Sequence, residues 1–191
     1  MILADYILTD TLEMKEHLFE FPSYKYKVAN WESRKKEMTD LISKQTFTKS
    51  PLSYFKTNRI PGKKDKEYTN SIAEFLTPVI SEFCQEEKVS CSMTDAWCVK
   101  YGKGDLQSIH NHRGWGFSGI LYVEFDPNVH SPTCFMAPWN DPRNDTTLLM
   151  LPKVEEGTVL ITPSFLHHFV YPNEVSKPRV VISFDLLPSF E

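Results

Sequence analysis

The second half of the chain is a succession of short segments that are rich in β-branched and aromatic residues. Gly, Pro, Asn and Asp separate these segments, as is typical of strands joined by turns. Strands are predicted at 96–101, 106–112, 117–125, 133–137, 147–151, 158–162, 167–171 and 178–186. So many short strands in one region predict a barrel or a sandwich.

The first half of the chain has the spacing of two amphipathic helices, at about residues 31–44 and 67–87. Pro78 lies inside the second window, so a kink or a break is expected there. The apolar stripe of that window consists of Ile72, Phe75, Leu76, Val79, Ile80 and Phe83. Helices of this kind would cover one outer face of a sheet, which predicts an α+β, mainly β fold.

The chain has 191 residues, which is about one domain at roughly 100–200 residues per domain. We expect a single domain over 1–191, with a helical support region at 1–90 and a β-rich core at 91–191. The net charge is −4, and this mild acidity argues against an electrostatic nucleic-acid binder. Residues 45–65 contain a short basic run and are interpreted as an exposed loop with solvated charges.

The cysteines and the N-terminus indicate a cytoplasmic protein. The four cysteines form no Cys-x-x-Cys pair, and we interpret them as reduced, mostly buried thiols: Cys84, Cys91, Cys98 and Cys134. No apolar run approaches the roughly 18 residues that span a membrane. Residues 1–20 carry Asp5, Asp10, Glu13 and Glu16, whereas a secretory signal has a basic start and an apolar middle.

Three of the six histidines are spaced as candidate metal ligands. His110 and His112 are two positions apart in a predicted strand, so both would project from the same face. Imidazole is the commonest metal ligand among side chains, although an isolated His-x-His is usually incidental. His168 follows 56 residues after His112 and would supply a third imidazole, whereas His167 would point to the opposite face. The pattern predicts one divalent metal ion on these three histidines.

Arg179 opens the apolar segment 179–184. A buried guanidinium without a counter-charge is costly, so this side chain requires an anionic partner. Its planar fork suits a carboxylate held by two parallel hydrogen bonds. By strand alternation Val181 and Ser183 share the face of Arg179, and the residues between them take the other face.

The pieces found so far resemble, in this order, the 2-oxoglutarate/Fe(II) oxygenases of marine phages and bacteria. Those enzymes have a double-stranded β-helix fold, which is jelly-roll or cupin-like, and they are distantly similar to prolyl hydroxylases. The resemblance covers Trp97 to Asp185, nearly half of the chain. It rests on Trp97-Cys-Val-Lys-Tyr101 with Gly104-Asp105, on His110-Asn-His112 with Ser118-Gly-Ile-Leu-Tyr122, on Pro163-Ser-Phe-Leu-x-His168, and on Arg179 with Ser183.

The resemblance implies a 2-oxoglutarate- and Fe(II)-dependent oxygenase. His110, His112 and His168 would hold Fe(II), and Arg179 would bind the C5 carboxylate of 2-oxoglutarate. Helpers for that carboxylate would be Tyr101, Tyr122 and Ser183. With O2 the enzyme would hydroxylate a peptide or protein side chain or a small molecule, and it would release succinate and CO2. It would work in the cytoplasm of a bacterial or phage-infected cell, without nucleic-acid or membrane partners.

Two positions depart from the family pattern. Many such oxygenases have a carboxylate where this chain has His112. The histidine would make the site more positive by one charge, so the site could favour another metal or His112 could stand off the metal. Related enzymes often have Arg-x-Ser, but Val181 takes the place of that serine and leaves Ser183 as the substitute. Two alternatives therefore stay open: a cupin-like metal-binding protein, and a three-histidine dioxygenase that does not use 2-oxoglutarate. An Arg179 paired with a protein carboxylate would favour them.

Overall fold

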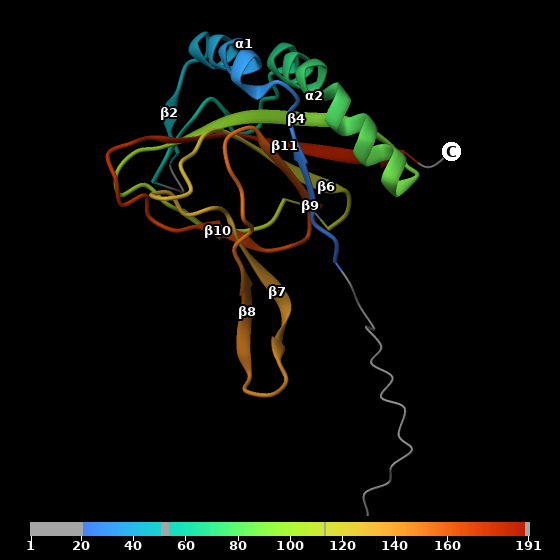
Figure 1. Cartoon of the computed structure of the whole chain (residues 1–191), viewed down its shortest axis with the longest axis vertical. Helices are drawn as coiled ribbons and strands as arrows, with labels where there is room; N and C mark the ends of the chain where they lie inside the picture. Colours follow the sequence, from blue (N-terminus) through green and yellow to red (C-terminus); the bar gives the residue numbers. More distant parts are fainter. Residues whose placement is uncertain (1–20, 51–53, 113, 190–191) are drawn as a thin grey trace, which may run out of the picture.

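Two antiparallel sheets form the body of the protein in the computed structural model, which describes residues 21–50, 54–112 and 114–189 (Figure 1). The order of the large sheet is β1-β9-β6-β11-β4-β3-β2, and that of the small sheet is β5-β10-β7-β8. The strands are β1 (Tyr24–Lys27), β2 (Thr48–Lys49), β3 (Lys56–Thr57), β4 (Ser90–Tyr101), β5 (Gln107–His110), β6 (Phe117–Glu124), β7 (Cys134–Asp141), β8 (Thr146–Met150), β9 (Thr158–Pro163), β10 (His168–Val170) and β11 (Arg179–Ser189).

The path of the chain from β4 to β11 is that of a double-stranded β-helix. It enters the large sheet at β4, β6, β9 and β11 and the small sheet at β5, β7, β8 and β10. Each of these eight strands overlaps one of the segments expected from the sequence, so the predicted fold class is confirmed. Two short strands of the small sheet, β5 and β10, lie side by side although nearly sixty residues separate them.

Two helices, α1 (Trp31–Ser43) and α2 (Lys66–Glu87), lie on one face of the large sheet (Figure 1). Asp65 caps α2 by accepting a hydrogen bond from the backbone N–H of Tyr68, and Pro78 lies within this helix without dividing it. A continuous core fills the space between the helices and the sheet, with Met38, Ile72, Leu76 and Phe83 among its fully buried members. No helix in the described part of the chain has the length and apolarity needed to cross a membrane.

A second core lies between the two sheets, and β11 separates it from the first. Val180, Ile182 and Phe184 face the helices, whereas Val181 packs in the second core with Tyr101 and Tyr122. This alternation confirms the expected parity of the strand. Gly119 is required beside β11, because a Cβ atom there would lie 2.0 Å from the ring of Phe184.

Three features differ from the sequence prediction. Residues before 90 supply helices and also β1, β2 and β3, which extend the large sheet at both edges. The predicted strand 106–112 ends at His110, and His112 lies in a bend where its backbone N–H bonds to the carbonyl of Ser164. The hairpin of β7 and β8 is longer than expected and extends away from the body, with all five residues of β8 exposed (Figure 1). The acidic N-terminal stretch lies outside the described residues.

Candidate metal centre

The three histidines singled out in the sequence come together at the mouth of the barrel. His110 at the end of β5 and His168 at the start of β10 are direct cross-strand partners, with ring centroids 4.3 Å apart. The ring of His112 lies 5.5 Å from that of His110 and 5.1 Å from that of His168. One ring nitrogen from each residue lies within 4.8 Å of the other two, a spacing that can hold a metal ion. His167 is exposed and lies outside this group.

Hydrogen bonds to Nδ1 fix the orientation of all three rings. The Nδ1 of His110 bonds to the carbonyl of Ser108 at 2.9 Å, and that of His168 to the carbonyl of Leu166 at 3.0 Å. Because a carbonyl oxygen only accepts, Nδ1 carries the proton and Nε2 keeps its lone pair. This is the tautomer that presents Nε2 to a metal ion.

His112 is oriented by a carboxylate that the sequence argument did not assign. Its Nδ1 lies 2.6 Å from Oδ1 of Asp185, which is buried on β11 and also accepts a hydrogen bond from the hydroxyl of Ser118. Asp185 shares strand parity with Arg179, so a buried acid on that face was the signal available in the sequence. This chain therefore has a histidine where related enzymes often have a carboxylate, and a carboxylate, that of Asp185, bonds to the far side of that histidine ring.

The environment keeps the imidazoles of His110 and His168 neutral. Burial, helped by the neighbouring rings of His110 and His112, lowers the pKa of His168 to about 3. Burial also lowers the pKa of His110, and the nearby charge of Arg59 acts in the same direction. Neutral imidazoles are the form that binds metal ions, so these side chains are ready to act as ligands at neutral pH.

Arg179 is a buried cation surrounded by aromatic rings. It is 1% exposed, and its guanidinium carbon lies 4.8 Å from the ring centroid of Tyr101 and 5.5 Å from that of Tyr122. Its one hydrogen bond within the described residues runs from Nη2 to the hydroxyl of Thr133, at 3.0 Å. Its Nε and Nη1 have no partner there, and no carboxylate of the described residues pairs with it. These two donors are available for an anionic ligand.

A narrow cavity between the sheets joins the histidines to the surroundings of Arg179. Tyr101, Thr133 and Ser183 line it together with the three histidines. Burial raises the pKa of Tyr101 to about 12, against the opposing effect of Arg179, so its hydroxyl remains a donor. That hydroxyl donates to Oε1 of Gln107, whose amide nitrogen lies 3.0 Å from Nε2 of His110. Gln107 was not predicted from the sequence, and nothing in its local pattern marks it.

The hydroxyl of Tyr122, the remaining predicted helper, accepts a hydrogen bond from the backbone N–H of Thr133. Tyr122 therefore supports both the ring environment of Arg179 and the backbone of its hydroxyl partner. The structure places every predicted helper near the histidines or near Arg179, and their roles in binding a co-substrate stay predictions.

A wider cleft of about 450 Å³ opens in front of His110 and His112. The segment between α1 and α2 forms one wall, with Thr48, Ser50, Phe55, Thr57, Arg59, Pro61 and Gly62. The opposite wall consists of Trp97, Gln107, Ser108, His110, Asn111, His112 and Asp185. A molecule bound in this cleft would lie directly beside the histidines.

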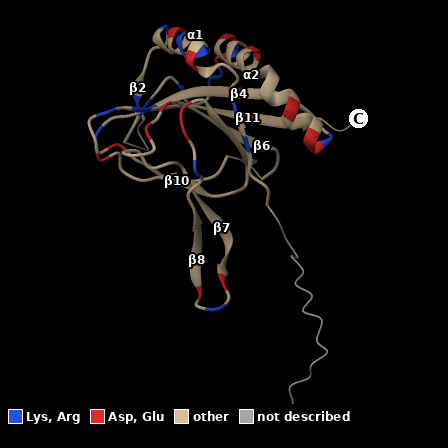
Figure 2. Cartoon of the chain, in the orientation of Figure 1, with Lys and Arg blue, Asp and Glu red and all other residues tan. Residues whose placement is uncertain are grey.

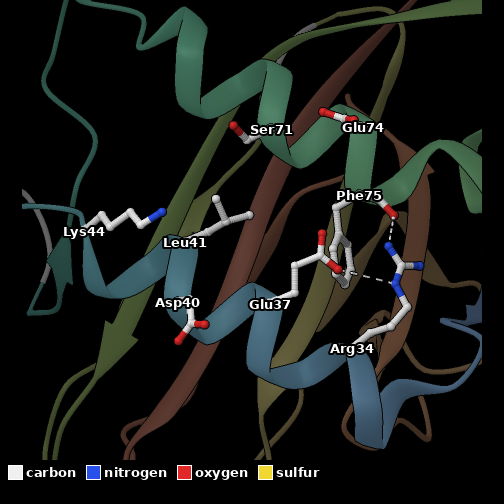
Figure 3. Close-up of a pocket in the computed structure, with 8 residues that line it drawn as sticks. All are labelled: Arg34, Glu37, Asp40, Leu41, Lys44, Ser71, Glu74 and Phe75. Carbon is white, nitrogen blue, oxygen red and sulfur yellow. Dashed lines mark hydrogen bonds and ion pairs between the residues drawn. The ribbon is translucent and has the colours of Figure 1, made fainter.

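Another cavity, of about 560 Å³, lies between α1 and α2 on the outer side of the large sheet (Figure 3). Three of its five charged side chains have partners in the described residues. Arg34 bonds to the carbonyl of Phe75 and lies 3.7 Å from Glu37, and Asp40 pairs with Lys36. This groove is separated from the histidines by the sheet, and it offers no comparable set of ligands.

Comparisons with known proteins agree with this geometry. A family model described as "Putative 2OG-Fe(II) oxygenase" matches residues 95–185. No curated protein sequence matches the chain. At the identities found below, likeness to solved structures shows the fold alone.

Three similar structures illustrate the likeness. An oxidoreductase of the 2OG-Fe(II) oxygenase family from Burkholderia pseudomallei is 12% identical, with a TM-score of 0.63 over 86% of this chain and 83% of that one. HygX from Streptomyces hygroscopicus, with nickel and 2-oxoglutarate bound, is 10% identical, with a TM-score of 0.65 over 89% and 84%. The viral collagen prolyl hydroxylase of Paramecium bursaria Chlorella virus-1 is 13% identical, with a TM-score of 0.53 over 88% and 96%.

The matched segment contains the three convergent histidines, the carboxylate behind His112 and the buried Arg179. A double-stranded β-helix carries all of them. Residues 95–185, the β-rich part of this chain, match the model of the 2OG-Fe(II) oxygenase family, and that family implies Fe(II) and 2-oxoglutarate as cofactors.

Proposed function

We propose that the protein oxidises a C–H bond of a primary substrate through Fe(II) held by His110, His112 and His168, with 2-oxoglutarate anchored by Arg179. The observation that carries this proposal is the buried guanidinium of Arg179 with two donors that no described group satisfies. A buried cation of this kind is costly unless an anion completes it. The C5 carboxylate of 2-oxoglutarate has the charge and the two-pronged shape to do so.

The three histidines fit the metal that the family implies. Imidazole suits iron as well as zinc, copper and nickel, and three Nε2 atoms on one side leave further positions open. His112 replaces a carboxylate and so removes one negative charge from the ligand set. Asp185 returns a negative charge one hydrogen bond away, and that bond fixes the orientation of the His112 ring.

Side chains around the narrow cavity would position the co-substrate. Arg179 would hold its far carboxylate, and Tyr101, Tyr122 and Ser183 would add hydrogen bonds or pack beside it. When bound with O2, iron and 2-oxoglutarate supply an oxidant strong enough for a C–H bond, and 2-oxoglutarate leaves as succinate and CO2. The protein's own contribution is to orient the reactants and to exclude water from the cavity.

The alternatives gain little support from this arrangement. A cupin-like metal-binding protein, or a three-histidine dioxygenase without 2-oxoglutarate, has no need of a buried cation beside the metal site. Within the described residues Arg179 pairs with no carboxylate that would make it a structural ion pair.

The primary substrate is proposed to be either a peptide or protein side chain or a small molecule. Among the similar structures are prolyl hydroxylases and a complex of HygX with hygromycin B, which illustrate both classes.

We further propose that residues 1–90 and 91–191 form one domain, because β1, β2 and β3 complete the large sheet. The four free thiols support a reducing, cytoplasmic setting.

Release of succinate from 2-oxoglutarate tests the proposed function. The purified protein with Fe(II) and O2 should produce succinate, and His168→Ala should abolish this activity. His167→Ala provides a matched control, because this neighbouring imidazole is exposed and lies outside the cluster. A protein that binds Fe(II) but neither binds nor consumes 2-oxoglutarate would refute the assignment.

A further inference from the structure

The segment from residue 44 to residue 66 is strongly basic in an acidic chain. It carries one acidic residue, Asp65, and seven basic ones: Lys44, Lys49, Lys56, Arg59, Lys63, Lys64 and Lys66. Its net charge is therefore +6, whereas the rest of the chain, with a total of −4, carries −10. Such a concentration of one sign creates a local positive potential that attracts anions.

This basic segment forms a wall of the cleft in front of the histidines. Its residues from Thr48 to Gly62 supply half of the cleft lining. Figure 2 shows a cluster of blue, for Lys and Arg, around β2. Arg59 is the basic residue of this segment that lines the cleft, so the positive charge lies on one side of the place where a molecule would reach the metal site.

Arg59 is the side chain that brings this charge into the cleft. Its guanidinium carbon lies 4.0 Å from the centroid of the Trp97 ring, and its Nη2 donates to Asp95 at 3.1 Å. The stacking fixes the plane of the guanidinium and the carboxylate fixes one edge, while 46% of the side chain remains exposed. The planar guanidinium of Arg59 has further N–H donors that could pair with an anion, and Ser108 and Asn111 line the same cleft.

Three lysines add to the field from the outer side of the same wall. Lys49 lies directly opposite Lys56 in the β2–β3 pair, and Lys56 lies directly opposite Lys100 in the β3–β4 pair. Like charges in directly opposed positions destabilise a sheet. The alternating residues Thr48 and Thr57 face the cleft, so the lysines act at a distance and Arg59 acts by contact.

We propose that the primary substrate is a small organic anion whose carboxylate or phosphate group pairs with Arg59 while its reacting carbon lies beside His110 and His112. The cleft volume of about 450 Å³ lies in the range of small-molecule sites, which favours a whole small molecule over an extended protein segment. This inference rests on the proposed function and names the substrate class that the same site would take.

The first test needs no knowledge of the substrate. Acetate and inorganic phosphate serve as probes, titrated into protein loaded with 2-oxoglutarate and with Zn(II), which has no redox chemistry. Two-dimensional NMR spectra of the arginine Nε–H groups should show a saturable shift of the Arg59 signal. The matched control is Arg143, which is 85% exposed in the turn after β7 and should not shift. An Arg59 signal that moves no more than that of Arg143 would overturn the inference.

The second test compares matched substrates in turnover. Organic acids and phosphate monoesters are assayed for stimulation of succinate release beside their neutral amides and parent alcohols. The anions should stimulate, and Arg59→Leu should raise the KM of the best one about tenfold, which corresponds to about 1.4 kcal/mol. Arg59→Lys should recover part of the loss, because it keeps the charge but not the planar fork. Arg143→Leu should leave the KM unchanged.

The outcomes separate this inference from the proposed function. Neutral compounds that stimulate as well as their anionic partners, or an unchanged KM in Arg59→Leu, would overturn the anionic substrate while leaving the oxygenase assignment intact. A protein without affinity for 2-oxoglutarate would instead remove the proposed function itself. Stimulation of succinate release by the organic acids would indicate a carboxylate substrate, and stimulation by the phosphate monoesters would indicate a phosphate substrate.

Discussion

Replacing Arg179 with Leu should weaken 2-oxoglutarate binding strongly while leaving metal binding nearly intact. Arg179 is 1% exposed, so solvent screening scarcely reduces the strength of its interaction with a carboxylate. A charge-assisted hydrogen-bonded pair contributes about 1.5–3 kcal/mol. The carboxylate left in the cavity without its partner adds a further penalty. We therefore expect affinity to fall by at least about tenfold, since ~1.4 kcal/mol is one factor of ten.

The same variant should show the opposite effect on the ligand-free protein. In the described structure the guanidinium has two donors without partners, and removing such a group is often neutral or stabilising. Thermal unfolding without ligand should thus give a Tm for Arg179→Leu that is equal to or above that of the wild type. The same concentration of 2-oxoglutarate should raise the Tm of the wild type more than that of the variant.

Anaerobic titration of 2-oxoglutarate into the metal-loaded protein measures the affinity directly. Arg179→Lys should recover part of the affinity, because an ammonium keeps the charge without the two-pronged geometry. The reasoning fails if the wild type does not bind millimolar 2-oxoglutarate, or if the Leu variant binds as well as the wild type. A loss of metal affinity equal to the loss of 2-oxoglutarate affinity would also refute it, because none of the three histidines lies on β11: His110 is on β5, His112 in the bend after it and His168 on β10.

Three further changes test other parts of the structure. Asp185→Asn should weaken metal affinity by roughly 10- to 100-fold, as is usual for the carboxylate behind a metal-bound histidine, and competition with a chelating dye measures this. His168→Ala should lose the metal site and His167→Ala should retain it; equal metal affinities in the two variants would show that the spacing argument selected the wrong residue. Gly119→Ala should destabilise the fold by about 1–3 kcal/mol through overpacking against Phe184, seen as a lower denaturation midpoint, and an unchanged midpoint would contradict the close approach.

The sequence pattern was sufficient to predict the strands of the barrel and the two helices. These elements are long enough, or regular enough, for their apolar spacing to show. β2 and β3 have two residues each, so they carry no periodicity, and they exist because β4 offers them an edge. β1 was missed for a similar reason, since its four residues are defined by pairing with β9.

Within the site, the sequence predicted which residue types converge but not what holds them. The convergence of His110 and His168 follows from a family pattern of distant strands. The bond from His112 to Asp185 depends on a bend after β5 and on the register of β11, which local patterns do not determine. Gln107 and Arg59 have the same status, because their places are defined by side-chain contacts with His110 and Trp97 that no local pattern shows.

Because His110 and His168 are direct cross-strand partners, a metal ion bound by both would link β5 to β10 in the small sheet. Only two residue pairs join β5 to β10, and one of them consists of these two ligands. A bound ion would therefore cross-link two strands that have few pairs of their own, whereas the large sheet has its own core beneath the helices. We expect removal of the metal to accelerate amide exchange in β5 and β10 and to leave β4 and β11 protected. The supply of iron in the cell would then govern the local opening of the barrel mouth as well as its chemistry.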